Sequence, residues 1–144
     1  MSADLSPVMS LAELEAFFLR DFPQAAADFR IERLTPEGLV LRLRVNDGHL
    51  RPGGTVSGPT MFALADVAVY LAILSRIGPV ALAVTTSSSM DFLRKPPPGR
   101  DLTGEARLLK LGRVLAVGDV LIRSGGDAAV VARASMTYSI PPKG

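Results

Sequence analysis

The segment that decides the fold is residues 58–75, which read GPTMFALADVAVYLAILS. Asp66 is its only charged residue, and nearly all of its neighbours are apolar or small. A carboxylate is rarely buried without a partner or a purpose, because its charge is costly to remove from water. A helix that is apolar on all sides either lies at the centre of a soluble fold or crosses a membrane. We expect the first and no membrane, because Asp66 interrupts the segment and amphipathic stretches flank it.

Length and composition predict one domain that spans residues 1–144. The chain is 48% hydrophobic and 21% charged, so it can bury a core. It has no Cys and one His, His49, which is a poor inventory for a metal site, and we expect no metal and no cofactor. The lack of Cys and of a secretory signal pattern favours a cytoplasmic location.

Charge is unevenly distributed along the chain. Residues 1–50 carry five basic and eight acidic residues, whereas residues 51–144 carry eleven and six. The basic excess is either ordinary solubilising surface or an attraction for an anionic ligand. Because aromatic residues are few and Trp is absent, we expect no nucleic-acid partner.

Periodicity predicts a helix and a hairpin before the apolar segment. Residues 10–22 have helical spacing, with Ser10 and Glu13 placed for a capping box and Pro23 as the stop. Residues 29–34 and 39–45 alternate apolar and charged side chains, as half-buried strands do. The turn residues at 35–38 join them into a hairpin.

A loop at 46–57 leads into the apolar helix, which ends at Gly78 and Pro79. Four strand-like runs follow, at 80–93, 102–111, 114–122 and 128–140, and a tight turn at 124–127 joins the last two. The order is helix, two strands, buried helix and four strands. This order predicts the α+β class, with a mostly antiparallel sheet that wraps one helix.

Three motifs add a family resemblance over residues 10–140. They are Gly54-Thr55-Val56-Ser57-Gly58-Pro59 with Asp66 seven residues later, the strand end 90–96 and the segment 111–117. Together they resemble the PaaI-like (phenylacetic-acid-degradation type) hot-dog fold thioesterases, whose pattern is Gly-Thr-Leu-His-Gly-Gly, six residues, then Asp. The resemblance implies a hot-dog fold, in which an antiparallel sheet wraps around one long central helix.

The chain departs from the family pattern at three positions. Ser57 stands where the family has His, Pro59 replaces the second Gly, and Arg51 takes the place of an upstream Asn. These changes leave Asp66 in place but alter the groups around the carbonyl site. Arg51 and Pro59 are therefore candidates for contacting the substrate.

The resemblance implies an acyl-CoA thioesterase for small or medium acyl groups, aromatic ones included. It assigns Asp66 as base or nucleophile, the Gly58 N–H as oxyanion donor and Thr85 as the residue that holds the attacking water. Helix physics supports Gly58 independently, because backbone N–H groups at a helix N-terminus are unpaired and the dipole there is positive. Pro59 suits the first turn, where no N–H is needed.

The spacing of Gly58 and Asp66 predicts how two copies assemble. The two residues are eight apart in sequence, so they stand about 12 Å apart along one helix. If both act on one thioester, they must come from different subunits with antiparallel helices. The resemblance implies the same arrangement, a homodimer that often pairs into a homotetramer.

Several site residues have a second interpretation. Ser57 contacts the substrate or only caps the helix, and it is disfavoured as a nucleophile because His49 has no visible reason to approach it. Thr85 either joins the site or, with its neighbours, packs small side chains against a crowded helix.

Other side chains are candidates for holding the substrate. Arg94, Lys95 and Arg113 bind coenzyme A phosphates or are solvated surface bases. Met61 and Phe62 line an acyl pocket or belong to the core, as do Tyr70 and Met90.

Three alternative interpretations follow from the same residues. In the first, the chain is a catalytically weak acyl-CoA-binding or regulatory hot-dog protein, which the loss of the motif His would fit. In the second, it is a dehydratase or hydratase, which typically needs an active-site His. In the third, Asp66 has no chemical role and is paired with Arg51 or a hydroxyl. The sequence specifies neither the acyl group nor whether coenzyme A or an acyl-carrier protein carries it.

Overall fold

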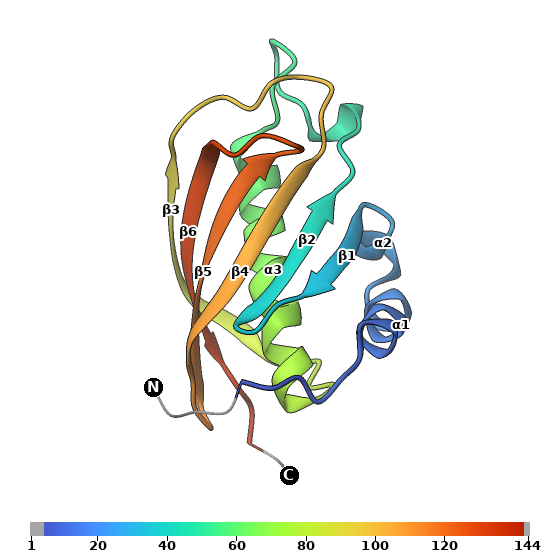
Figure 1. Cartoon of the computed structure of the whole chain (residues 1–144), viewed down its shortest axis with the longest axis vertical. Helices are drawn as coiled ribbons and strands as arrows, with labels where there is room; N and C mark the ends of the chain where they lie inside the picture. The colour runs from blue at the N-terminus through green and yellow to red at the C-terminus, as the bar shows by residue number, and fades with distance from the viewer. Residues whose placement is uncertain (1–4, 143–144) are drawn as a thin grey trace.

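The computed structural model describes residues 5–142. A six-stranded antiparallel sheet wraps around one long helix, α3 (Gly58–Ile77), as Figure 1 shows. The sheet order is β1-β2-β4-β5-β6-β3, and every neighbouring pair is antiparallel. The strands are β1 (Phe29–Leu34), β2 (Gly38–Leu43), β3 (Val84–Phe92), β4 (Leu102–Leu111), β5 (Leu115–Ser124) and β6 (Val130–Ser139). The α+β hot-dog prediction is confirmed.

Helix α3 is the core of the molecule. It is long and apolar enough to cross a membrane, but 67% of its most apolar window is buried inside the fold, which accounts for its composition. Glycines on the sheet let the strands approach it closely. A Cβ on Gly104 of β4 would lie 3.3 Å from Leu64, and one on Gly118 of β5 would lie 3.3 Å from Val69. Backbone, not side chain, therefore meets the helix there.

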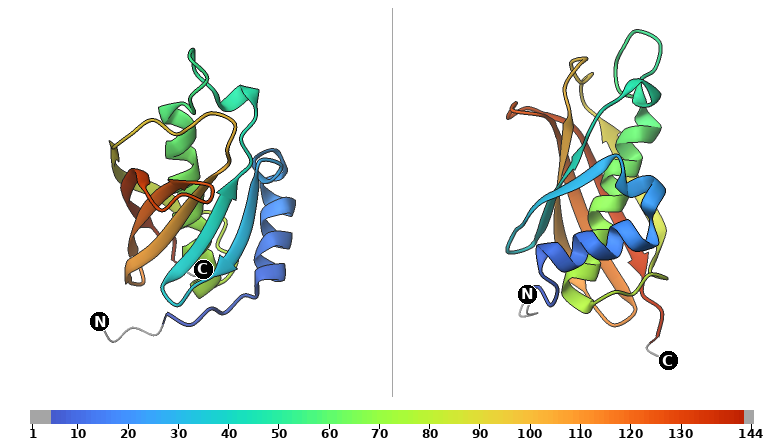
Figure 2. Two further views of the ribbon diagram at one scale, coloured as in Figure 1. Left: turned by 45° about the horizontal axis from the view of Figure 1, so that its top comes forward. Right: turned by 90° about the vertical axis from the view of Figure 1, so that its right-hand side faces the viewer.

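The N-terminal helices pack beside α3, as the right-hand view of Figure 2 shows. Helix α1 (Leu11–Asp21) begins with the predicted capping box between Ser10 and Glu13. Helix α1 ends at Asp21 with Phe22 as its C-cap, so the prediction that this helix stops at Pro23 is confirmed. Pro23 also opens a short second helix that the sequence did not predict, α2 (Pro23–Ala26), after a break at Phe22 (φ −135°, ψ 58°). Proline suits this place because the first helical position needs no N–H donor.

The predicted strands were right in number and order, but four had wrong limits. Strand β2 runs from Gly38 to Leu43 and not over residues 39–45. Residues 80–83 form a turn, in which the Ala83 N–H donates to the Val80 carbonyl, so β3 begins only at Val84. Strand β5 runs on to Ser124, because Ser124 pairs with Leu102 across the ladder to β4. The Asp127 N–H donates to the Ser124 carbonyl at 2.9 Å, so the predicted turn at 124–127 is confirmed, but β6 begins at Val130 rather than at residue 128. The loop at 46–57 also contains a short 3-10 helix, η1 (Asp47–His49).

Strand β3 lies at the edge of the sheet, and among residues 5–142 it pairs only with β6. Residues 86–89 of β3 are exposed, so the prediction that this hydroxyl-rich run packs against a crowded helix is wrong. The pairing shifts between Thr85 and Ser87, which leaves Thr86 as an extra residue in a β-bulge. Bulges of this kind redirect neighbouring side chains and occur often beside functional sites.

Candidate active site

Two side chains meet at the carboxylate of Asp66, in the middle of α3, and the three residues together form the Asp66 cluster. The Thr85 hydroxyl donates to Asp66 Oδ1 at 2.6 Å, and the Tyr138 hydroxyl donates to the same oxygen at 2.6 Å. Tyr138 also donates to the Asp66 backbone carbonyl at 2.9 Å. Thr85 and Tyr138 are direct partners in the β3–β6 ladder, so the register of two strands brings both hydroxyls to one oxygen.

Uncharged donors stabilise this carboxylate. Burial raises the pKa of Tyr138 well above its ordinary value, and the hydrogen bond to Asp66 adds to the shift, so Tyr138 remains protonated and donates. Asp66 Oδ2 has no hydrogen-bond partner among residues 5–142, and it is not a buried atom. Asp66 therefore has one oxygen held by the fold and one oxygen free to react. The alternative pairing with Arg51 is wrong, because the partners of Asp66 in the described chain are hydroxyls.

A pocket of about 410 Å³ opens beside Asp66. Its lining comes from α1 and α2 with the break between them, from α3, from the turn before β3 with the start of β3, and from β6. The lining residues are Phe18, Phe22, Ala25, Asp66, Val67, Tyr70, Ala81, Ala83, Val84, Thr85 and Tyr138. The prediction that Met61 and Phe62 line the acyl pocket does not hold for this pocket. Met61 is buried in the core and Phe62 is exposed.

The N-terminus of α3 carries the predicted oxyanion donor. The Ser57 side chain accepts from the Thr60 N–H at 3.3 Å and shares a 2.8 Å hydrogen bond with the Thr60 hydroxyl, so the helix-cap interpretation of Ser57 is confirmed. The Gly58 N–H has no hydrogen-bond acceptor within residues 5–142, and Pro59, the next residue, has no backbone N–H. Phe92 lies against Gly58, since a Cβ there would be 3.3 Å from Phe92 Cζ.

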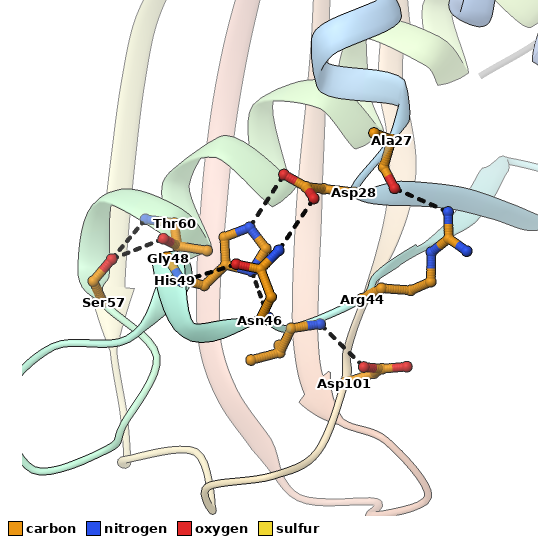
Figure 3. A network of polar contacts seen from close by, with 10 residues as sticks. Ala27, Asp28, Arg44, Asn46, Gly48, His49, Ser57, Thr60 and Asp101 are labelled. Carbon is orange, nitrogen blue, oxygen red and sulfur yellow. Dashed lines mark hydrogen bonds and ion pairs between the residues drawn. The ribbon is translucent and has the colours of Figure 1, made fainter.

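His49 comes nearer to Ser57 than the sequence suggests (Figure 3). The loop folds back so that the Ser57 N–H donates to the His49 carbonyl at 2.9 Å. The two side chains nevertheless serve different networks. The His49 ring contacts Asp28 at 3.3 Å and accepts from the Asn46 N–H at 3.0 Å, while the Ser57 hydroxyl is held by Thr60. The pair is therefore not arranged as a nucleophile and its base.

The candidate phosphate-binding bases do not gather at one place in the chain. Arg94 and Lys95 follow β3, at the end of the sheet where α3 begins, and Arg51 lies in the loop at that end. The β4–β5 turn, which holds Arg113, is at the opposite end in Figure 1. All four are exposed, and none forms an ion pair within the described range.

Sequence reasoning missed Tyr138 and the aromatic residues of α1. Tyr138 stands on the inward side of an alternating strand, in step with Ala134 and Met136, so its position on the helix-facing side was readable. Phe18 was assigned only to the apolar stripe of the predicted helix and Phe22 only to its end, and nothing local indicates that these residues cover a pocket on α3.

Comparisons with known proteins agree with this architecture. The family model of the thioesterase superfamily matches residues 53–131, more than half of the chain. A crystal structure from Silicibacter sp. TM1040, described as a "putative thioesterase", is 56% identical and has a TM-score of 0.90 over 96% of each chain. A mutant of the phenylacetic acid degradation protein PaaI from Thermus thermophilus is 30% identical, with a TM-score of 0.70 over 84% of this chain and all of the other.

A third structure, smu.793 from Streptococcus mutans UA159, is bound to acetyl CoA. It is 26% identical, with a TM-score of 0.69 over 80% of this chain and 90% of the other. Fold, motif order and family model thus agree, and the chain belongs to the thioesterase superfamily.

Proposed function

We propose that this protein hydrolyses acyl-CoA thioesters of small or medium acyl groups. Asp66 carries the proposal, because its carboxylate lies in a pocket with Oδ1 held by two hydroxyls and Oδ2 free. A related structure from Streptococcus mutans holds acetyl CoA, which supports a coenzyme A thioester as substrate. Asp66 acts as the base that activates water or as the nucleophile that attacks the carbonyl carbon.

The Thr85 hydroxyl limits how it can hold water. Its hydrogen is donated to Asp66, so Thr85 offers only its lone pairs to a water molecule. A water between Thr85 and Asp66 Oδ2 would donate to both, which leaves its oxygen free to attack. A single turnover in isotopically labelled water tests the nucleophilic route, since label enters Asp66 only if its carboxylate has formed an anhydride that water opens at the Asp66 carbon.

The oxyanion donor comes from a second copy of the chain. Gly58 and Asp66 lie on one continuous helix, about 12 Å apart, which is too far for one carbonyl. Two observations support a homodimer, or a tetramer built from it: the Gly58 N–H has no acceptor within residues 5–142, and β3 has an unpaired edge. Antiparallel copies would also bring Arg113 of one chain toward the Arg94 and Lys95 end of the other.

The direct test is release of free thiol from a panel of acyl-CoA thioesters. We expect Asp66→Asn to lower kcat/KM at least about 100-fold, because a positioned base contributes that much or more. Asp127→Asn, in the exposed β5–β6 turn, is the matched control and should keep full activity. An Asp66→Asn variant with undiminished turnover would refute the assignment.

Ser57 gives a second candidate function, a catalytically weak acyl-CoA-binding protein. Its hydroxyl is committed to the helix cap, so no side chain replaces the motif His beside the carbonyl site. Purified protein that binds an acyl-CoA in calorimetry, yet releases no thiol over hours, would favour this function over hydrolysis.

A further inference from the structure

Away from Asp66, Thr85 and Tyr138, the side chains that line the pocket are apolar except for Tyr70. The Tyr70 hydroxyl is the other polar group in the lining, and it donates to the Ala81 carbonyl at 3.1 Å. Burial keeps this tyrosine uncharged, since it raises the pKa of Tyr70 to about 12. A group that enters the pocket therefore meets hydrocarbon and aromatic rings, which suits an unsubstituted acyl chain and not a polar one.

Helix geometry sets how far the aromatic residues of the pocket lie from Asp66. Tyr70 follows Asp66 by four residues, about 6 Å further along the helix. The Phe22 ring contacts Tyr70 edge-on, with centroids 5.5 Å apart and an interplanar angle of 85°. Phe22 thus reaches the pocket about one helical turn from the carboxylate.

Phe22 is held by the backbone at the break between α1 and α2. Its N–H donates to the Phe18 carbonyl at 2.8 Å, and its own carbonyl accepts from the Ala26 N–H at 2.8 Å. Pro23 fixes the backbone that follows. The ring is 37% exposed, so it stands between the pocket and solvent. Removing the ring would open the pocket outward, and the backbone position would not change.

We propose that the α1–α2 break forms the end wall of the acyl pocket, and that Phe22 is a specificity-determining residue that limits acyl chain length. This inference rests on the proposed thioesterase function. Short and medium linear acyl groups fit between Asp66 and the wall, whereas longer chains meet the Phe22 ring. Ala25, on the next helical turn, lines the same wall with a small side chain.

Two opposite substitutions test the wall, with kcat/KM measured on acetyl-, butyryl-, octanoyl-, lauroyl- and palmitoyl-CoA. Phe22→Ala should raise the lauroyl-to-butyryl ratio of kcat/KM about tenfold or more, because each accommodated methylene contributes to discrimination. Ala25→Leu narrows the pocket and should shift preference toward acetyl and butyryl groups. Leu19→Ala, on the exposed side of α1, is the control and should keep the wild-type profile.

The outcomes separate this inference from the function on which it rests. Hydrolysis with the same chain-length profile in Phe22→Ala and Ala25→Leu would overturn the wall and leave the thioesterase assignment standing. No hydrolysis of any thioester by the wild-type protein would overturn both. Should Phe22→Ala fail to fold, Ala25→Leu decides alone, since its profile either contracts or does not.

Discussion

Asp66 owes its environment to residues far away in the sequence. Thr85 and Tyr138 lie on different strands, yet both donate to one carboxylate oxygen. These two donors are uncharged, and Asp66 forms no ion pair within residues 5–142. The other oxygen stays available for chemistry.

Tyr138→Phe isolates the hydroxyl from the ring. We expect kcat/KM to fall roughly tenfold or more, because a hydrogen bond to a charged group contributes about 1.5–3 kcal/mol. Steady-state kinetics across pH measures the loss, and thermal unfolding shows whether the fold persists. Thr86→Val removes an exposed hydroxyl at the neighbouring bulge and serves as the control. Equal losses in both variants would mean that the effect is structural.

At the scale of elements, α1 is the part of the fold that completes the pocket. Phe22, the C-cap residue of α1, reaches α3 through its edge-on contact with Tyr70, and Tyr70 in turn lies 6.2 Å from Tyr138 by ring centroids. Ring contacts therefore link the N-terminal helices to the Asp66 cluster. Packing there affects both stability and the shape of the acyl pocket.

Tyr70 predicts a loss of stability at alkaline pH. An unfolded tyrosine ionises near pH 10, but burial keeps Tyr70 protonated in the fold up to about pH 12. Between these values the native state binds more protons, so the free energy of unfolding falls as pH rises. We expect Tyr70→Phe to remove about 2 kcal/mol of that fall by pH 11.5. Tyr138 shifts in the same direction and retains its own share.

Denaturant midpoints near pH 9 and pH 11.5 measure this difference. The wild-type midpoint should drop more than that of Tyr70→Phe. A wild-type midpoint that is flat over this range, or equal drops in the two proteins, would show that Tyr70 is not held neutral by the fold.

At the scale of the whole molecule, one chain supplies only part of each proposed active site. One chain supplies Asp66, Thr85 and Tyr138 with the acyl pocket, and its own Gly58 N–H stands too far away to serve them. The exposed edge of β3 offers backbone groups for a partner strand. Two copies related by a two-fold axis would form two equivalent sites.

Mixing two inactive variants tests this assembly. Gly58→Pro removes the donor N–H at a helix position that tolerates proline, and Asp66→Asn removes the carboxylate. If each site draws on both chains, refolding an equal mixture restores about a quarter of wild-type activity, through mixed dimers with one intact site. Size-exclusion chromatography of each variant confirms its oligomeric state. No recovery in the presence of mixed dimers would place both residues in one chain's site.

The sequence alone determined the architecture, because the relevant signals are local. Capping at Ser10, the alternation of the strands and the apolar segment around Asp66 each record the physics of neighbouring residues. Their order then leaves few ways to bury one apolar helix. The motif spacing also located Gly58 and Asp66, and helical rise alone implied that one chain cannot join them.

Only the tertiary structure decided what surrounds Asp66. The Thr85–Tyr138 pairing depends on the register of β3 with β6 and on the bulge at Thr86, and register joins residues more than 50 positions apart. The acyl wall depends on how α1 packs across α3, which an amphipathic pattern does not specify. Local sequence determines which element forms, whereas contacts between distant elements determine which side chains meet in the pocket.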